Sequence, residues 1–161
     1  MSEIIKYRSI GIIRTPFNQL ENMPIQPGGA FKVRGELIID PELVPGLTDL
    51  EGFSHLFLIY HFHKVKDYDL IVTPFLDEKK HGVFATRAPK RPNPIGLSIV
   101  RLNSIEENKL ILENVDMLDG TPILDIKPYV PAFDQQEQVT TGWLTGKDPE
   151  IKAKRSDERF V

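Results

Sequence analysis

The sequence predicts a mainly β protein: a single-sheeted antiparallel β-barrel with short helical turns and a polar C-terminal tail. Short runs rich in β-branched and aromatic residues follow one another along the chain, and clusters of Gly, Pro, Asn and Asp separate them. Little of the sequence has the periodicity of a helix. Many short strands with frequent turn signals fold either as a closed barrel or as a sandwich, and of the two we favour the barrel.

The first half of the chain is predicted to supply strands at residues 9–13, 31–39 and 53–63. The third of these is the most apolar run in the sequence and is expected to be a central strand. A long loop at residues 22–29 contains paired prolines and paired glycines, and loops of this length are usually functional or disordered. Asp40 followed by Pro41 is typical of a helix N-cap and first helical position, so one or two short helical turns are expected before Gly52.

The second half is predicted to contain further strands at residues 69–74, 99–105, 109–115 and 123–129. Residues 106–108 form the short turn of a hairpin, and residues 83–85 begin like a strand after a glycine. We assign residues 1–145 to the barrel domain and residues 146–161 to a charged C-terminal tail. This tail mixes both signs of charge with little apolar material, and it is expected to be a solvated helix or a disordered end.

The composition fits one globular domain. A chain of 161 residues can bury a full-sized core, and 40% hydrophobic with 27% charged residues is ordinary for a soluble protein. The absence of cysteine excludes disulfides, thiolate zinc sites and cysteine nucleophiles. No signal peptide or membrane-spanning run is evident, so a cytoplasmic protein is expected. A net charge of −3 argues against a surface coated by nucleic acid but permits a local basic patch.

The segment from Gly82 to Ser98 combines rigidity with charge. Pro89, Pro92 and Pro94 each fix φ and favour an extended predecessor, so the loop has little conformational entropy to lose on binding. Its polar side chains, which suit a polar or anionic ligand, are those of Arg87, Lys90, Arg91 and Asn93. Taken singly, each residue is explained as a strand breaker or a solvated turn residue. Taken together, they favour a binding loop.

A second polar segment surrounds Asp119 and Gly120, a dipeptide that is common in hairpin turns. A turn alone would explain this pair. The neighbouring side chains are more polar than a turn requires, and they are Asp116, Thr121, Asp125, Lys127 and Tyr129. Carboxylates and backbone groups at such a strand end would hold a ribose hydroxyl, an amino group or a cationic centre.

Other catalytic signals are weak. His61 and His63 lie on the same face of a strand, but no third ligand stands at a motif spacing, so we expect no metal site. A polar residue satisfied at the strand end, or a ligand contact by His63 and Lys64, explains the pair better. Ser98 lacks the surroundings of a nucleophilic serine, and neither the dinucleotide-binding nor the P-loop glycine motif is present.

Two long motifs are similar to those of a known family. The first consists of Thr86-Arg87 followed by Arg91-Pro92-Asn93-Pro94-Ile95-Gly96-Leu97-Ser98, and the second of Asp119-Gly120-Thr121-Pro122 followed by Asp125-Ile126-Lys127-Pro128-Tyr129. Through them the chain resembles the TsaA-like, or TrmO, family from Tyr7 to Pro131. The resemblance implies a β-barrel tRNA methyltransferase that uses S-adenosyl-L-methionine to methylate N6 of threonylcarbamoyladenosine next to the anticodon. It also implies a homodimer whose active sites form near the subunit interface.

The resemblance also implies which residues contact the cofactor. The positions that carry over are Pro24, Ile25, Gln26, His63, Lys64, Arg87, Leu97, Asp119, Gly120, Thr121 and Pro122. Ile25 is a departure, because many members of the family have arginine there. Bacterial members resembling this chain carry an extra C-terminal domain, for which we expect no counterpart here.

Methyl transfer from a sulfonium is an in-line displacement, which requires alignment in a dry pocket rather than a metal or a covalent intermediate. The substrate-binding candidates are Lys90, Arg91 and Asn93, of which the cations would neutralise RNA phosphates or the carboxylate of the modified base. The catalytic candidates are Asp125, Lys127 and Tyr129. The tyrosine would stack on a splayed base, and the carboxylate or the amine would orient the acceptor nitrogen or relay its proton. The alternatives are a non-catalytic RNA- or nucleotide-binding barrel and a small-molecule methyltransferase.

Overall fold

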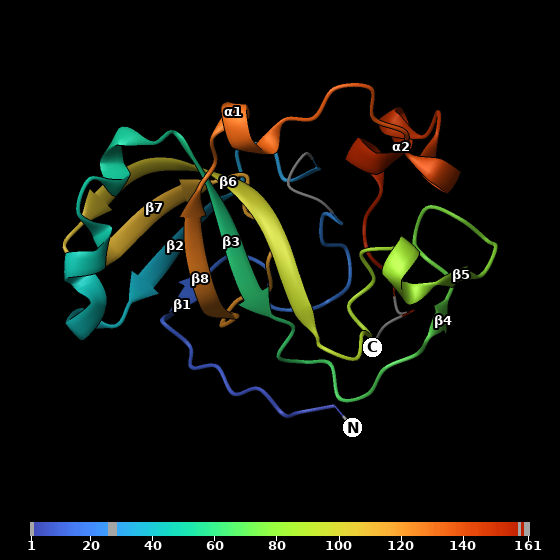
Figure 1. Cartoon of the computed structure of the whole chain (residues 1–161), viewed down its shortest axis with the longest axis horizontal. Helices are drawn as coiled ribbons and strands as arrows, with labels where there is room; N and C mark the ends of the chain where they lie inside the picture. Colours follow the sequence, from blue (N-terminus) through green and yellow to red (C-terminus); the bar gives the residue numbers. More distant parts are fainter. Residues whose placement is uncertain (1, 26–28, 158, 160–161) are drawn as a thin grey trace.

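The computed structural model describes residues 2–25, 29–157 and 159, and a closed barrel of antiparallel strands forms its larger part (Figure 1). Around the barrel the strands follow the order β1, β2, β7, β6, β3, β8. Their bounds are β1 (Gly11–Arg14), β2 (Arg34–Ile39), β3 (His55–His61), β6 (Ile95–Glu106), β7 (Lys109–Glu113) and β8 (Pro122–Pro128). The prediction of a mainly β antiparallel barrel is therefore confirmed, and the chief difference is that β6 begins inside the predicted binding loop.

Alternation along each strand sends every second side chain into the barrel interior. In β3 the buried positions include Leu58 and Tyr60, and in β6 they include Ser98 and Val100. Leu58 lies opposite Ser98 across the β3–β6 pair, and Tyr60 lies opposite Gly96. The interior is therefore apolar over most of its length and becomes polar where β3 ends and β6 begins.

The barrel closes where β1 meets β8. Gly11 pairs with Ile123 and Ile12 pairs with Pro122 at this seam, whereas β1 pairs with β2 along its whole length. Gly11 is required by the close approach of β2 on the other side of β1, because a Cβ at this position would overlap the carbonyl oxygen of Ile38.

A smaller lobe stands beside the barrel, to the right in Figure 1. It contains the short pair β4 (Ile71–Val72) and β5 (His81–Gly82), followed by the 3-10 turn η4 (Val83–Ala85). The prediction of a strand at residues 83–85 is wrong, because the chain turns there and the amide of Thr86 bonds the carbonyl of Val83 at 3.1 Å. Val83 is thereby turned into the small core of this lobe.

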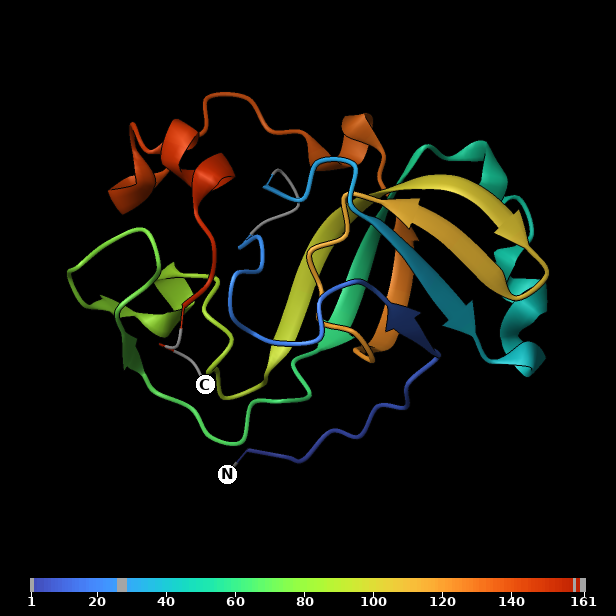
Figure 2. The same ribbon diagram turned by 180° about the vertical axis from the view of Figure 1, so that it is seen from behind.

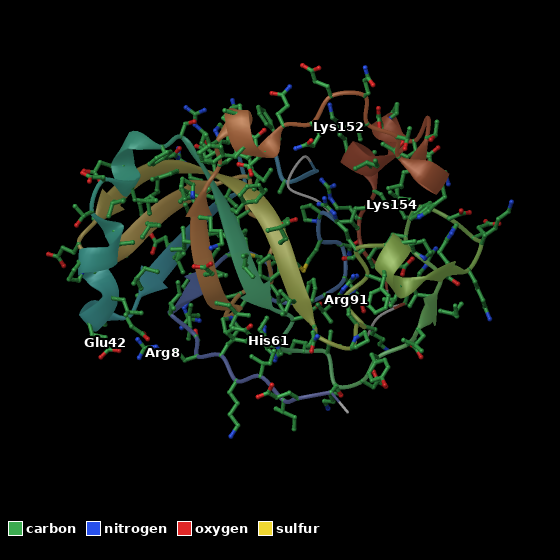
Figure 3. All side chains as sticks on the ribbon, viewed as in Figure 1. Arg8, Glu42, His61, Arg91, Lys152 and Lys154 are labelled. Atoms are coloured by element: carbon green, nitrogen blue, oxygen red, sulfur yellow. The ribbon has the colours of Figure 1, made fainter. Side chains whose placement is uncertain are left out.

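The helical turns expected after β2 are the 3-10 helices η2 (Pro41–Leu47) and η3 (Leu50–Gly52). Pro41 stands at the start of η2 as expected, but Asp40 makes no side-chain capping bond. The backbone amide of Asp40 instead donates to the carbonyl of Ile10 at 3.0 Å, which holds the turn against the start of the barrel. Nearby, Arg8 and Glu42 form an ion pair on the surface, labelled in Figure 3.

Beyond the barrel the chain contains α1 (Pro131–Asp134), η5 (Gly142–Leu144) and α2 (Asp148–Ala153), the last of which lies in the predicted tail. After α2 the tail returns to the loop that follows β1. Ser156 exchanges backbone hydrogen bonds with Asn22 and Met23, at 3.0 and 2.8 Å, and Arg155 forms a β-bridge with Pro24. The tail thus includes a helix, as one of the two expected forms, but also packs against the chain. The domain boundary at residue 145 stays a prediction.

Candidate functional site

A cavity of about 340 Å³ opens at the polar end of the barrel. Its walls come from the loop after β1, the end of β3, the loop before β6, the segment before β8 and the returning tail. Figure 2 shows the loop after β1 passing between the barrel and the tail. The volume lies within the usual range for small-molecule sites, about 300–1,000 Å³.

A chain of hydrogen bonds crosses the cavity floor. The hydroxyl of Ser98 donates to Oδ1 of Asp116 at 2.7 Å, and the hydroxyl of Tyr60 lies 3.1 Å from that of Ser98. Tyr60 and Ser98 face inward because each is in phase with the apolar residues of its strand. A carboxylate is therefore held in a fixed position at the mouth of an apolar barrel.

The surroundings change the acidity of this network. Burial raises the pKa of Asp116 to about 6, although the hydrogen bond from Ser98 and the positive charge of Arg87 act in the opposite direction. Burial and the charge of Asp116 raise the pKa of Tyr60, so the phenol stays protonated. At the rim, burial and the neighbouring charges of Lys64 and His61 lower the pKa of His63. The floor thus holds an acid that changes its charge close to physiological pH.

Arg91 stiffens the loop before β6. Its Nη1 donates to the backbone carbonyls of Thr86, Ala88 and Val83, at 2.9, 3.1 and 3.3 Å. In Figure 3 Arg91 lies between the barrel and the small lobe. Arg91 lines the cavity, but its Nη1 already binds the loop itself.

The turn at Asp119 is anchored to β1. Its Oδ1 accepts a hydrogen bond from the backbone amide of Thr15 at 3.0 Å, and its Oδ2 lies 3.4 Å from Nη1 of Arg14. Gly120 has a φ of +77°, a conformation that glycine adopts without strain. This geometry supports the structural interpretation of the Asp-Gly pair, while the next residue, Thr121, faces the cavity.

The structure brings together part of the predicted site. The cavity is lined by Pro24, Ile25, His63, Lys64, Arg87, Arg91, Leu97 and Thr121. Its lining does not include Lys90, Asn93, Asp119, Gly120, Pro122, Asp125, Lys127 or Tyr129. Gln26 lies outside the described residues. Within the described part of the chain, no cluster of three or more His, Cys, Asp or Glu side chains is placed to hold a metal ion, and no helix is long and apolar enough to cross a membrane.

A β-bulge explains why the catalytic candidates stand apart. The register between β3 and β8 shifts after Ile59, so that Ile59 faces Asp125 and Phe57 faces Lys127. These positions of β3 are the outward ones. Asp125 and Lys127 therefore form an ion pair of 2.8 Å on the outer wall of the barrel. Tyr129 packs edge-on against Phe57 on the same wall, with ring centroids 5.6 Å apart.

Sequence reasoning missed Tyr60, considered Ser98 only as a nucleophile and a motif residue, and placed Asp116 only within a polar cluster. Strand phase was the available signal, because Tyr60 and Ser98 are polar residues at positions where their strands send apolar side chains inward. A neighbouring groove of about 790 Å³ shares Arg87 with the cavity and is lined by aromatic side chains, among them Phe84 and Trp143.

The chain is similar to proteins of one known family. Residues 12–135 match the tRNA-methyltransferase O N-terminal domain. A probable S-adenosyl-L-methionine-binding protein of Pyrococcus abyssi is 52% identical over 157 residues, which cover 98% of this chain and 85% of that protein. The human tRNA (adenine(37)-N6)-methyltransferase is 34% identical over 81% of this chain and 31% of its own length.

A crystal structure of TrmO from Pseudomonas aeruginosa superposes with a TM-score of 0.74 at 40% identity. The match covers 88% of this chain and 63% of that one, so the present chain spans less than two thirds of the solved protein. The family match extends from β1 to just beyond α1, and thus includes the whole barrel and the motifs on either side of the cavity. The chain therefore belongs to the tRNA-methyltransferase O family, of which it contains the N-terminal barrel domain.

Proposed function

We propose that this chain is an S-adenosyl-L-methionine-dependent methyltransferase that methylates N6 of threonylcarbamoyladenosine at position 37 of tRNA, beside the anticodon. The observation that carries the proposal is the cavity at the barrel mouth. It collects His63, Arg87 and Leu97, three positions that the family motifs assign to the cofactor, although they are distant in sequence. Such a substrate would place the enzyme in the cytoplasm.

The residues of the cavity fit the proposed cofactor. Apolar side chains such as Met23, Phe62 and Leu97 supply walls for an adenine ring and a methionine chain. Arg87 would pair with the amino-acid carboxylate, and the neutral His63 at the rim would accept or donate a hydrogen bond. When bound, S-adenosylmethionine supplies a methyl group on an electrophilic sulfonium. The task of the protein is then to align donor and acceptor and to exclude water.

Basic side chains beside the cavity suit an RNA acceptor. Lys64 lies on the rim, and Lys66 and Lys90 line an adjoining shallow groove. Phosphate contacts of this kind position an RNA without reading its sequence. The groove also contains Glu21 and Asp67, and Lys90 lies 3.7 Å from Asp67, so Lys64 and Lys66 are the lysines of this group without an ion pair among the described residues.

The proposal includes a homodimer. Its support is the exposed apolar surface near the cavity mouth, where Ile95 is 40% and Leu97 is 46% accessible. A partner seated on this surface would cover the site. It would also give the outer-wall residues Asp125, Lys127 and Tyr129 a way to reach a site, because they do not line this cavity in their own protomer. Light scattering at micromolar concentration should give twice the chain mass. A monomer that binds the cofactor tightly would remove the shared site from the proposal.

The deciding experiment is mass spectrometry of tRNA nucleosides after incubation of hypomodified tRNA with the protein and cofactor. We expect a methyl group on threonylcarbamoyladenosine. Binding of the cofactor without methylation of any tRNA or small molecule would favour the non-catalytic barrel. Methylation of a small molecule alone would favour the third alternative. Arg87→Ala serves as the site control, because it should remove the product without unfolding the barrel.

A further inference from the structure

Asp116 is a cavity acid that the motifs do not assign to the cofactor. It is partly buried and lines the cavity. Its carboxyl is held by Ser98 at 2.7 Å, and Ser98 is in turn held by Tyr60 at 3.1 Å. Both hydroxyl residues stand on inward positions of β3 and β6, so the barrel itself fixes the direction of this carboxylate.

We propose that Asp116 recognises the positive charge of the cofactor's sulfonium and thereby makes the cavity prefer S-adenosylmethionine to its neutral demethylated product. This inference rests on the proposed function, and it assigns to Asp116 a role in specificity.

The first argument is the chemistry of a sulfonium. This cation has no N–H group to donate, so a protein recognises it through nearby negative charge, the faces of aromatic rings and weak C–H···O contacts. Much of the lining is apolar, which means that a bound cation loses water and needs a counter-charge. The carboxylates among the described lining residues are Asp116 and Asp157. Asp157 already forms an ion pair with Arg159 at 3.0 Å, which leaves Asp116 as the fitting partner.

The second argument is the charge state of Asp116. Burial raises its pKa to about 6, and the hydrogen bond from Ser98 and the charge of Arg87 favour the ionised form. The remaining titratable or charged groups around the cavity are Tyr60, whose phenol is neutral, and His63, Lys64, Arg91 and Asp157. The carboxylate is therefore ionised at neutral pH, and a bound cation would stabilise that form further.

The preference for the sulfonium ligand over its demethylated product would help product release during turnover. Once the methyl group has left, the sulfur is a neutral thioether and Asp116 loses its counter-charge. The product is then bound less tightly than the substrate, which favours its release. Because both ligands share the adenosine and the amino-acid end, the ratio of their affinities reports the methyl group and the positive charge alone, and the change of this ratio on neutralising Asp116 reports the charge.

Calorimetry with S-adenosylmethionine and S-adenosylhomocysteine tests this inference. For Asp116→Asn we expect an affinity loss of about tenfold or more for the sulfonium ligand and less than about threefold for the thioether. In the wild type the preference should decline as the pH falls below about 6, where Asp116 becomes protonated. Ser98→Ala removes a hydrogen bond that favours the ionised carboxyl, so this decline should move to higher pH. Glu106→Gln, the same loss of charge at the far end of β6, is the matched control and should behave as wild type.

Thermal unfolding of each variant checks that it is folded, and the affinity ratio removes effects common to both ligands. Equal losses for both ligands in Asp116→Asn leave the affinity ratio unchanged and would overturn the inference. A wild-type preference that does not depend on pH would overturn it as well. If the wild type binds neither ligand, the proposed function fails and this inference fails with it. Binding of both ligands with a ratio insensitive to Asp116→Asn refutes the inference alone.

Discussion

Replacing Gly96 by alanine would place a methyl group against the ring that forms the cavity floor. A Cβ at this position would overlap Cε2 and Cζ of Tyr60 and would lie 2.9 Å from Cζ of Phe62. The two rings already pack edge to face with centroids 5.4 Å apart, and Tyr60 is only 7% exposed. Because the added Cβ overlaps its ring, the tyrosine must shift toward the cavity and carry its hydroxyl away from Ser98.

The cost follows from these contacts. Forcing an extra methyl group into a packed interior costs about 1–3 kcal/mol. Loss of the hydrogen bond between Tyr60 and Ser98 adds roughly 1 kcal/mol. Alanine recovers about 0.5–1 kcal/mol relative to glycine in a strand. We therefore expect Gly96→Ala to lower the free energy of unfolding by about 2 kcal/mol, and the Tm by roughly 4–8 °C for a domain of this size.

Urea unfolding and calorimetry with S-adenosylhomocysteine would measure the two effects, stability and cofactor affinity. Gly82→Ala is the matched control, since an added Cβ there meets no atom within 4 Å and its φ of −60° suits any residue. Combining Gly96→Ala with Tyr60→Leu removes the ring, so the double variant should lose at least about 1 kcal/mol less than the sum of the singles. A Gly96→Ala protein with wild-type stability and affinity would refute the close packing of the floor.

Arg87→Ala should leave the barrel folded and weaken cofactor binding by about 1–3 kcal/mol, the range for a charge-assisted contact; normal affinity with a much lower Tm would contradict this. Asp77 has its pKa lowered to about 2, chiefly by the hydrogen bond with His81, so its contribution to stability is present above about pH 4 and lost as the pH falls toward 2. The Tm of Asp77→Asn should therefore fall less than that of the wild type as the pH is lowered from about 4 to 2. Parallel curves of Tm against pH would show that Asp77 does not make this contribution. Ser156→Ala removes the hydroxyl that donates to the carbonyl of Leu20 and accepts from the amide of Met23, so it should destabilise the tail by about 1 kcal/mol and speed its proteolysis. Ser104→Ala on an exposed position is its control, and equal digestion of both variants would count against the packing of the tail.

The barrel could be predicted because strand alternation and turn residues are local signals. The cavity could be predicted only in part, since the motifs identify Arg87 and Leu97 but not which strands and loops bring them together. A one-residue bulge after Ile59 determines that Asp125 faces outward, and the sequence of β8 contains no signal that predicts this bulge. The proposed role of Asp116 depends on its distance from Ser98, and Asp116 lies in the irregular segment between β7 and β8, whose path strand alternation does not specify. The return of the tail rests on backbone hydrogen bonds, which leave no compositional trace.

The seam between β1 and β8 has a consequence for how the protein folds. It joins the first strand of the barrel to the last, and Pro122 lies in it, a residue that has no amide to donate. Contacts between such distant segments form slowly, because the entropy of the intervening chain is lost before the contact stabilises anything. We expect closure of the barrel to be the late, slow step of folding, and amides of β1 at the seam to exchange with solvent sooner than those of the central β3–β6 pair. Tyr60 and Ser98 of the cavity floor belong to that central pair, so these two residues would come together before the barrel closes and stay together when the seam opens.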